Sequence, residues 1–308
     1  MNLRTILAAL VIVAACYLNF AMAEHHVMEG DFQVVQMFSH LVPAAIVTGA
    51  DHARLLSIDL PAALAGLDMD LTRDGAQLIL TNMQIFMVMS VFLIFIVLGG
   101  VANYVRTGKG DALSKIFAGF CMFIRDDMVY PVMGAGTGRK FLPYFLGLFF
   151  FIVFMNLVGL VPFSATPTAG IATTFGLALF TFVIMVAGGM LVQGPFNYIK
   201  HLVPEVPWWL WPLMFVVELI GVLAKPFALM VRLFANMSGG HMVVLSFIGL
   251  IFLAASQAGT SVAWAASPFA VGFAVFIMII EAFVALLQAY VFTYLSILFI
   301  GGSLHPDH

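Results

Sequence analysis

Long runs without a charged residue follow one another along this chain. They cover residues 75–105, 141–199, 233–280 and 282–306. A helix of about 20 apolar residues spans the hydrocarbon layer of a bilayer, so each run has room for at least one crossing. The pattern predicts an all-α polytopic membrane protein.

Five membrane helices are predicted from these runs. The first is expected over about residues 79–102, and a hairpin follows over 142–163 and 170–193, with an uncharged turn that holds two prolines. Between the first helix and the hairpin we expect a loop over 103–141. Within that loop, the stretch DALSKIFAGFCMFIRDDMVY (111–130) is a candidate interfacial amphipathic helix.

The last two helices are predicted to be unusually long. Between residues 212 and 255 the strong breaking signals are Pro226 and Gly239-Gly240. An unbroken helix there would measure about 66 Å, twice the hydrocarbon thickness of about 30 Å. The final helix, over about 266–300, would measure about 50 Å. We therefore expect either a break or a pair of strongly tilted helices, joined by an uncharged turn.

The distribution of basic residues predicts which side of the membrane each loop lies on. Six of the 12 lysines and arginines fall within 103–141, and such an excess marks a cytoplasmic loop. We therefore expect the chain before the first helix to lie outside the cell. A short tail over 304–308 would then be cytoplasmic.

The first 23 residues have the features of a signal peptide. Arg4 precedes an apolar run, and Ala21-Met22-Ala23 has the small-residue pattern of a cleavage site. An uncleaved first helix and a lipoprotein-type cut before Cys16 are alternatives that give the same topology. Residues 24–77 form an acidic extracytoplasmic segment.

Composition excludes several functional classes. The chain is 63% hydrophobic and 9% charged, whereas soluble domains carry roughly 25% charged residues. It has no basic patch for nucleic acid. The stretch "TGKG" (107–110) does not indicate a nucleotide-binding loop, because it lacks the Ser or Thr of a phosphate loop. The spacing of Glu24, His25, His26 and His40 matches no established metal site. We expect neither a cofactor nor a metal, and nucleotide chemistry would belong to other chains.

Ionisable residues inside an apolar helix are the candidate functional residues. Glu218, Lys225 and Arg232 are spaced by seven residues and share one helix face, with Asn236 on the same side. Lys225 could snorkel to the interface, and Glu218 could pair with it. Arg232 sits deep in the helix and keeps its charge at ordinary pH, so it needs an acid or water nearby.

A second polar set lies on the far side of that helix and on the last one. His241 comes nine residues after Arg232, about 180° round, and would point into the body of the protein unless the preceding glycines reorient it. Glu281 and Gln288 repeat the seven-residue spacing. A histidine beside a carboxylate is a candidate proton relay; the alternative is a histidine that only packs between helices.

Three stretches together closely resemble subunit a of F-type ATP synthases. They are KPFALMVRLFANMSGGH (225–241), FMNLVGLVPFSATPTAG (154–170) and LLQAYVFTYLSILFIGG (286–302). The resemblance covers about residues 80–302, which is most of the predicted membrane domain over 78–303. The acidic segment lies outside it.

The resemblance implies a stator subunit with two offset half-channels for protons and an essential arginine that faces the carboxylates of a rotating c-ring. It implies an outer-side path at His241 and Glu281 and a cytoplasmic-side path at Glu218. The implied proton-translocation residues are Arg232, Asn236, His241, Glu281, Gln288 and Glu218, with Lys225, Asn156 and Ser238 as secondary candidates. The implied partners are the c-ring, the peripheral-stalk b subunits, the remaining ATP synthase subunits and the lipid bilayer of a bacterial inner membrane.

The sequence departs from the family pattern at two positions. Ala235 replaces the glycine usual between Phe and Asn, and Gly159 stands where some bacterial members have an aspartate. The histidine also precedes the acid, as in some members and not in others. Two other classes remain as alternatives: a secondary cation/proton transporter, which also holds intramembrane charges, and a flagellar-type stator, which usually has a large cytoplasmic region.

Overall fold

The chain is described by a computed structural model over residues 7, 10–14, 57–59, 77–79, 82–161, 166–196, 198, 206, 207 and 209–304. Most of the signal-like and acidic segments lies outside this set, as does the tail after Leu304. Cys16 and the three histidines considered as metal ligands also lie outside the described residues.

The described part of the chain is helical, which confirms the predicted all-α fold class. Its one sheet there is a pair of antiparallel three-residue strands, β1 (Ser57–Asp59) and β2 (Gln77–Ile79). The long helices are α3 (Asn82–Thr107), α4 (Ala112–Phe123), α5 (Tyr130–Gly159), α6 (Ile171–Gln193), α8 (Trp211–Ala258) and α9 (Thr260–Leu304). A π-helical segment, η2 (Ile124–Val129), joins α4 to α5, and a 3₁₀ turn, η3 (Pro167–Ala169), precedes α6.

Five stretches of the described chain are long and apolar enough to cross a membrane, as predicted. They are Met83–Thr107, Ala112–Gly159, Ile171–Gln193, Trp211–Gln257 and Trp264–Leu304. The bounds predicted for α6 differ from the observed ones by one residue. The chain is therefore a multi-pass membrane protein.

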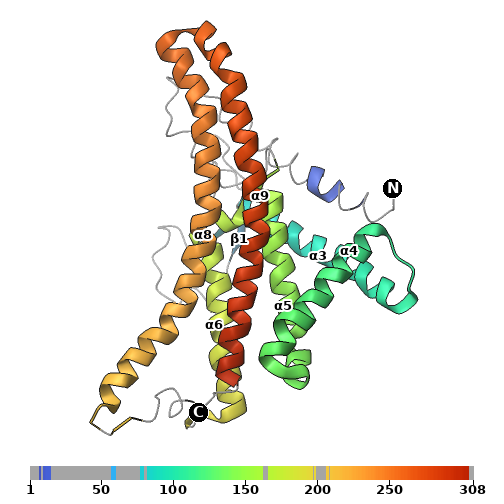
Figure 1. Ribbon diagram of the computed structural model, residues 1–308, viewed down its shortest axis with the longest axis vertical. Coiled ribbons are helices and arrows are strands. Elements are labelled where there is room, and N and C mark those ends of the chain that lie inside the picture. Colours follow the sequence, from blue (N-terminus) through green and yellow to red (C-terminus); the bar gives the residue numbers. More distant parts are fainter. Residues whose placement is uncertain are drawn as a thin grey trace.

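The candidate helix over 111–130 within the predicted loop forms, as α4 and η2, but most of the rest of the expected loop is helical too, because α3 runs to Thr107 and α5 begins at Tyr130. Helical structure runs through α4, η2 and the start of α5 (Figure 1). Near its start α5 is kinked at Gly134, where φ is 68° and ψ is 162°. Glycine adopts a positive φ without steric cost, and this kink lays α4 against α5. The ring centroids of Phe117 and Phe150 are 5.7 Å apart, and those of Phe120 and Phe149 are 6.3 Å apart.

Helices α8 and α9 form an antiparallel hairpin that extends beyond α5 and α6 at one end of the molecule (Figure 1). By their residue counts they measure about 72 and 68 Å, so neither could cross a bilayer upright and stay within it. Neither Pro226 nor the two glycines interrupts α8. An uncharged turn joins the two helices, as predicted, but it is shorter than the gap expected between about 255 and 266: the reversal occurs at Gly259 (φ 88°), and α9 begins at Thr260.

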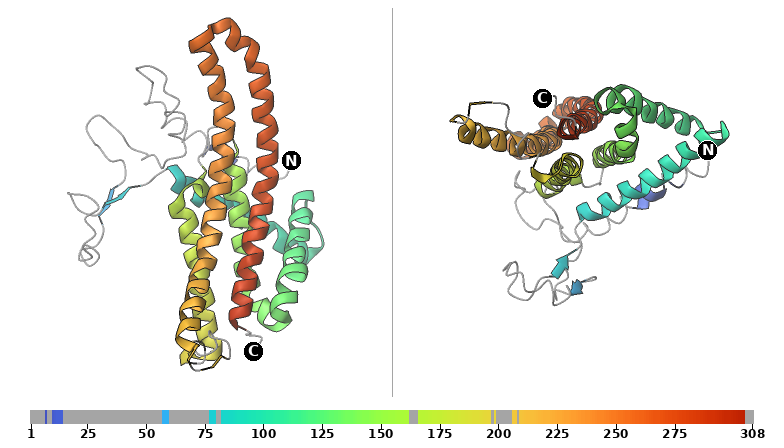
Figure 2. Two further views of the ribbon diagram at one scale, coloured as in Figure 1. Left: turned by 60° about the vertical axis from the view of Figure 1, so that its left-hand side comes forward. Right: turned by 90° about the horizontal axis from the view of Figure 1, so that it is seen from below.

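Helix α9 is the central packing element, because it contacts α5, α6 and α8 (Figure 2). Its inner face carries small and apolar side chains that are fully buried, including Ala285, Ala289 and Phe292. The same face carries Glu281 and Gln288 into the interior, where they are 5% and 1% exposed. The fold thus places two polar side chains of α9 between the helices and away from its lipid-facing surface.

Candidate functional site

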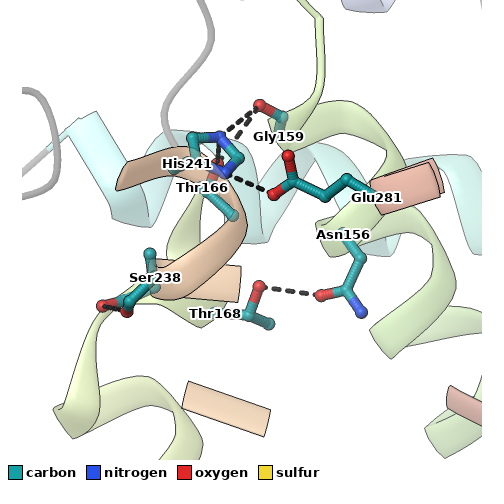
Figure 3. Close-up of polar contacts among 8 residues, drawn as sticks. Asn156, Gly159, Thr166, Thr168, Ser238, His241 and Glu281 are labelled. Carbon is teal, nitrogen blue, oxygen red and sulfur yellow. Dashed lines mark hydrogen bonds and ion pairs between the residues drawn. The ribbon is translucent and has the colours of Figure 1, made fainter. Parts of the chain in front are cut away.

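A buried pair of ionisable side chains links the two longest helices. Nδ1 of His241 in α8 lies 2.7 Å from Oε1 of Glu281 in α9 (Figure 3). A contact of this length needs a hydrogen between the two atoms, because their lone pairs would otherwise repel each other. Either the imidazole donates from Nδ1 to a carboxylate, as a cation or as the neutral ring with its hydrogen on Nδ1, or a protonated carboxyl donates to a neutral ring. In each case one hydrogen is shared between the two side chains.

The other nitrogen of the imidazole faces the connection between α5 and α6. Nε2 of His241 lies 2.9 Å from the hydroxyl of Thr166 and 3.2 Å from the carbonyl oxygen of Gly159 (Figure 3). The same hydroxyl lies within 3.2 Å of that carbonyl and can donate to it. The histidine therefore points into the body of the protein, as its helical position predicted.

Two glycines make room for this pair. A Cβ at Gly240 would lie 2.6 Å from Cδ and Oε1 of Glu281, and a Cβ at Gly159 would overlap the side chain of Thr166. The aspartate of some family members cannot fit at Gly159 unless Thr166 moves. In this chain the position contributes a backbone carbonyl in place of a side chain.

A layer of uncharged polar groups lies beside the ionisable pair. Asn156 of α5 donates to the carbonyl of Ala285 at 3.4 Å and accepts from the hydroxyl of Thr168 at 2.7 Å. Ser238 of α8 donates to the carbonyl of Ala169 at 3.3 Å. Asn156 thereby ties α5 to α9 at a position between Glu281 and Gln288.

A pair of amides bridges α8 and α9 further along. Nδ2 of Asn236 donates to Oε1 of Gln288 at 2.6 Å. Nε2 of Gln288 is buried and has no hydrogen-bond partner within the described part of the chain. The structure thus brings together two residues that the sequence had placed only on matching polar stripes. It also leaves one donor available for water or another group.

Arg232 lies on the opposite side of α8 from His241. It is exposed on the surface of this chain, and it forms no ion pair with an acid among the described residues. Lys225 is also exposed, with Nζ 5.5 Å from the ring centroid of Phe299. The considered ion pair between Glu218 and Lys225 does not form in the described structure.

The structure joins four of the six predicted proton-translocation residues in two pairs, one of His241 with Glu281 and one of Asn236 with Gln288, and it adds groups that sequence reasoning missed. Thr166, Thr168 and the carbonyl of Gly159 were not singled out as site groups, although all three lie within a stretch that carried the family resemblance. Two threonines and a serine in an otherwise apolar turn were the available signal. Across the described residues, no three His, Cys, Asp or Glu side chains cluster as metal ligands would.

Five apolar helices, a buried imidazole–carboxylate pair and an exposed arginine on an apolar helix define a multi-pass membrane protein with ionisable groups inside its membrane domain. Such groups are costly in a bilayer and mark ion pathways. A family model described as "ATP synthase A chain" matches residues 84–301. The chain belongs to this family.

Curated relatives support the assignment. The "ATP synthase subunit a" of Myxococcus xanthus is 47% identical over 192 residues, which cover 61% of this chain and 61% of that protein. That of Chloroherpeton thalassium is 40% identical over 239 residues, or 76% of this chain and 69% of that protein. The "ATP synthase subunit a 2" of Chlorobaculum tepidum is 39% identical over 248 residues, or 79% and 66%. The chain thus spans about three fifths to two thirds of the length of these relatives.

Proposed function

We propose that this chain is the proton-conducting stator subunit of an F-type ATP synthase and itself carries out no nucleotide chemistry. Two aqueous half-channels reach the middle of the membrane from opposite sides without meeting. A c-ring turns against the surface that displays Arg232, and the peripheral-stalk b subunits hold this chain in place. Residues 24–77 lie outside the cell and the end of α9 lies at the cytoplasmic side of a bacterial inner membrane.

In this mechanism the ring carries protons as neutral carboxylic acids. A proton from outside passes the pair of His241 and Glu281 and neutralises a ring carboxylate, which can then enter lipid because it no longer carries a charge. After nearly a full turn it reaches the inner half-channel, which Glu218 lines, and loses its proton. Each charge that crosses 100 mV makes available about 2.3 kcal/mol, so several crossings can support one ATP.

Arg232 separates the two half-channels in this mechanism. Its guanidinium stabilises the ionised ring carboxylate, which promotes proton release. Its fixed charge also opposes a proton that would pass directly from one half-channel to the other. Because the guanidinium stays charged at any ordinary pH, the barrier does not titrate away.

One observation carries the proposal: α8 holds the permanent cation of Arg232 on an exposed face, whereas His241, which shares an exchangeable proton with Glu281, lies on the buried face. A cation whose role was to stabilise the fold of this chain would be expected to have an acidic partner within it, since an unpaired charge in a bilayer is costly. Arg232 has none among the described residues. This supports a partner that brings the carboxylate from outside the chain.

The test uses the whole complex in sealed vesicles. Arg232→Ala should abolish ATP synthesis driven by a proton gradient, whereas Arg139→Gln, at an exposed arginine outside the site, should leave it unchanged. Normal synthesis by the Arg232 variant would contradict the proposal. If the purified chain alone carried out substrate-driven ion flux, it would be a secondary transporter, and the proposal would be wrong.

A further inference from the structure

The imidazole of His241 is held by a hydroxyl that can reverse its hydrogen bond. Thr166 is 3% exposed, and its Oγ1 lies 2.9 Å from Nε2 of His241 and 3.2 Å from the carbonyl oxygen of Gly159. That carbonyl is only an acceptor, whereas a threonine hydroxyl both donates and accepts. The three groups form a closed triangle (Figure 3).

Two hydrogen-bond patterns fit this triangle. When Nε2 carries a hydrogen it donates to Oγ1 of Thr166, and the hydroxyl donates to the carbonyl of Gly159. When Nε2 carries a lone pair, the hydroxyl rotates and donates to it. In both patterns Nε2 has a partner, so the ring can keep Nδ1 at 2.7 Å from Glu281.

Without the hydroxyl, only one of these patterns remains. The carbonyl of Gly159 lies 3.2 Å from Nε2 and can accept from an N–H, but it repels a lone pair. An imidazole that lacks hydrogen on Nε2 would then be pushed away from this position, and its contact with Glu281 would break. A hydroxyl that can both donate and accept is needed at this place only if the ring changes its protonation state.

We infer that Thr166 is a positioning residue of the proton relay, whose hydroxyl holds the imidazole of His241 against Glu281 in both protonation states of Nε2. This inference rests on the proposed function, because a histidine that never titrates needs only one hydrogen-bond pattern. Thr166 acts through His241 and exchanges no proton with the c-ring.

The experiment compares variants of the whole ATP synthase in sealed vesicles and measures proton-driven ATP synthesis per assembled complex. Thr166→Val removes the hydroxyl at almost constant volume and should lower the rate by about three- to tenfold, as expected for one lost hydrogen bond. Thr166→Ser keeps the hydroxyl and should restore the wild-type rate. Thr174→Val is the matched control, because the buried hydroxyl of Thr174 bonds only to backbone carbonyls near the start of its own helix. The rate of ATP synthesis by this variant should equal that of wild type.

A double-mutant cycle separates positioning from general damage to the fold. In a His241→Ala background, Thr166→Val should cause little further loss, because the hydroxyl no longer has a ring to hold. The inference would be overturned if the rate losses of the two single variants simply multiply in the double variant. It would also be overturned if Thr166→Ser is as slow as Thr166→Val, or if Thr166→Val is as fast as wild type. If the valine variant does not assemble, Thr166→Ala, which is smaller and fits the same space, replaces it.

The same vesicles distinguish this inference from the proposed function. An inactive Arg232→Ala complex alongside a fully active Thr166→Val complex would overturn only the role of Thr166. A fully active Arg232→Ala complex would overturn the proposed function itself.

Discussion

Adding one methyl group at Gly240 should damage the proposed proton relay while leaving α8 folded. In Gly240→Ala the new Cβ would lie 2.6 Å from Cδ and Oε1 of Glu281, whereas ordinary contact begins at 3.4 Å. The carboxyl group must therefore retreat by about 0.8 Å, the difference between these two distances. A retreat along the bond to Nδ1 of His241 lengthens it from 2.7 Å to about 3.5 Å, which is beyond a useful hydrogen bond.

The sizes of the competing effects favour a loss of function over a loss of folding. Alanine in place of glycine inside a helix is worth about 1 kcal/mol in favour of the helix, and the displaced group is the flexible end of a side chain. A hydrogen bond to a charged group contributes about 1.5–3 kcal/mol, and 1.4 kcal/mol corresponds to about tenfold in an equilibrium. We therefore expect proton-driven ATP synthesis to fall about tenfold or more in complexes that assemble normally.

The neighbouring glycine provides the control. A Cβ at Gly239 would meet nothing within 4 Å, so Gly239→Ala makes the same chemical change one residue away, without the displacement. Both variants should be assayed as whole complexes in sealed vesicles, with ATP-driven proton pumping as a second readout. Equal activity of the two variants would refute the reasoning, because then the close approach at Gly240 does not control the relay.

Two further predictions concern the same pair. Exchanging His241 and Glu281 together should preserve more proton-driven ATP synthesis than losing either one, because the exchange keeps an imidazole beside a carboxyl; single losses that combine independently would contradict the coupling. Gly159→Asp should lower the activity of assembled complexes, because its Cβ overlaps the side chain of Thr166, whereas Gly147→Ala on the same helix meets nothing within 4 Å and should be neutral.

The helices could be predicted because their signal is local. An apolar stretch of sufficient length must form a helix in lipid, where every backbone group needs an internal partner. The bounds of α6 and the length of α8 follow from this rule. The seven-residue spacing also placed Gln288 on the same face as Glu281 and Asn236 on the same side as Arg232, but the contact between the two amides was not predicted and comes from the structure.

The turns and their contacts could not be predicted in the same way. The kink at Gly134 and the reversal at Gly259 each depend on one glycine with positive φ, and many other glycines in this chain do not turn it. The role of Thr166 depends on a chain segment folding back onto α8, 75 residues further along. Periodicity within one helix carries no information about which loop will meet it.

Helix geometry also limits how the relay and the arginine can cooperate. His241 comes nine residues after Arg232, which places it about 13.5 Å further along α8 and on the opposite side of the helix. In the proposed mechanism, a proton that travels from the buried pair to a c-ring carboxylate beside Arg232 would therefore pass around α8, and the seam between α8 and α9 offers polar groups for that path. Asn236 and Gln288 occupy that seam, and amides can order water without carrying a charge. Because an acid placed there would pair with the arginine and remove its charge from the path, uncharged polar residues suit this position better than ionisable ones.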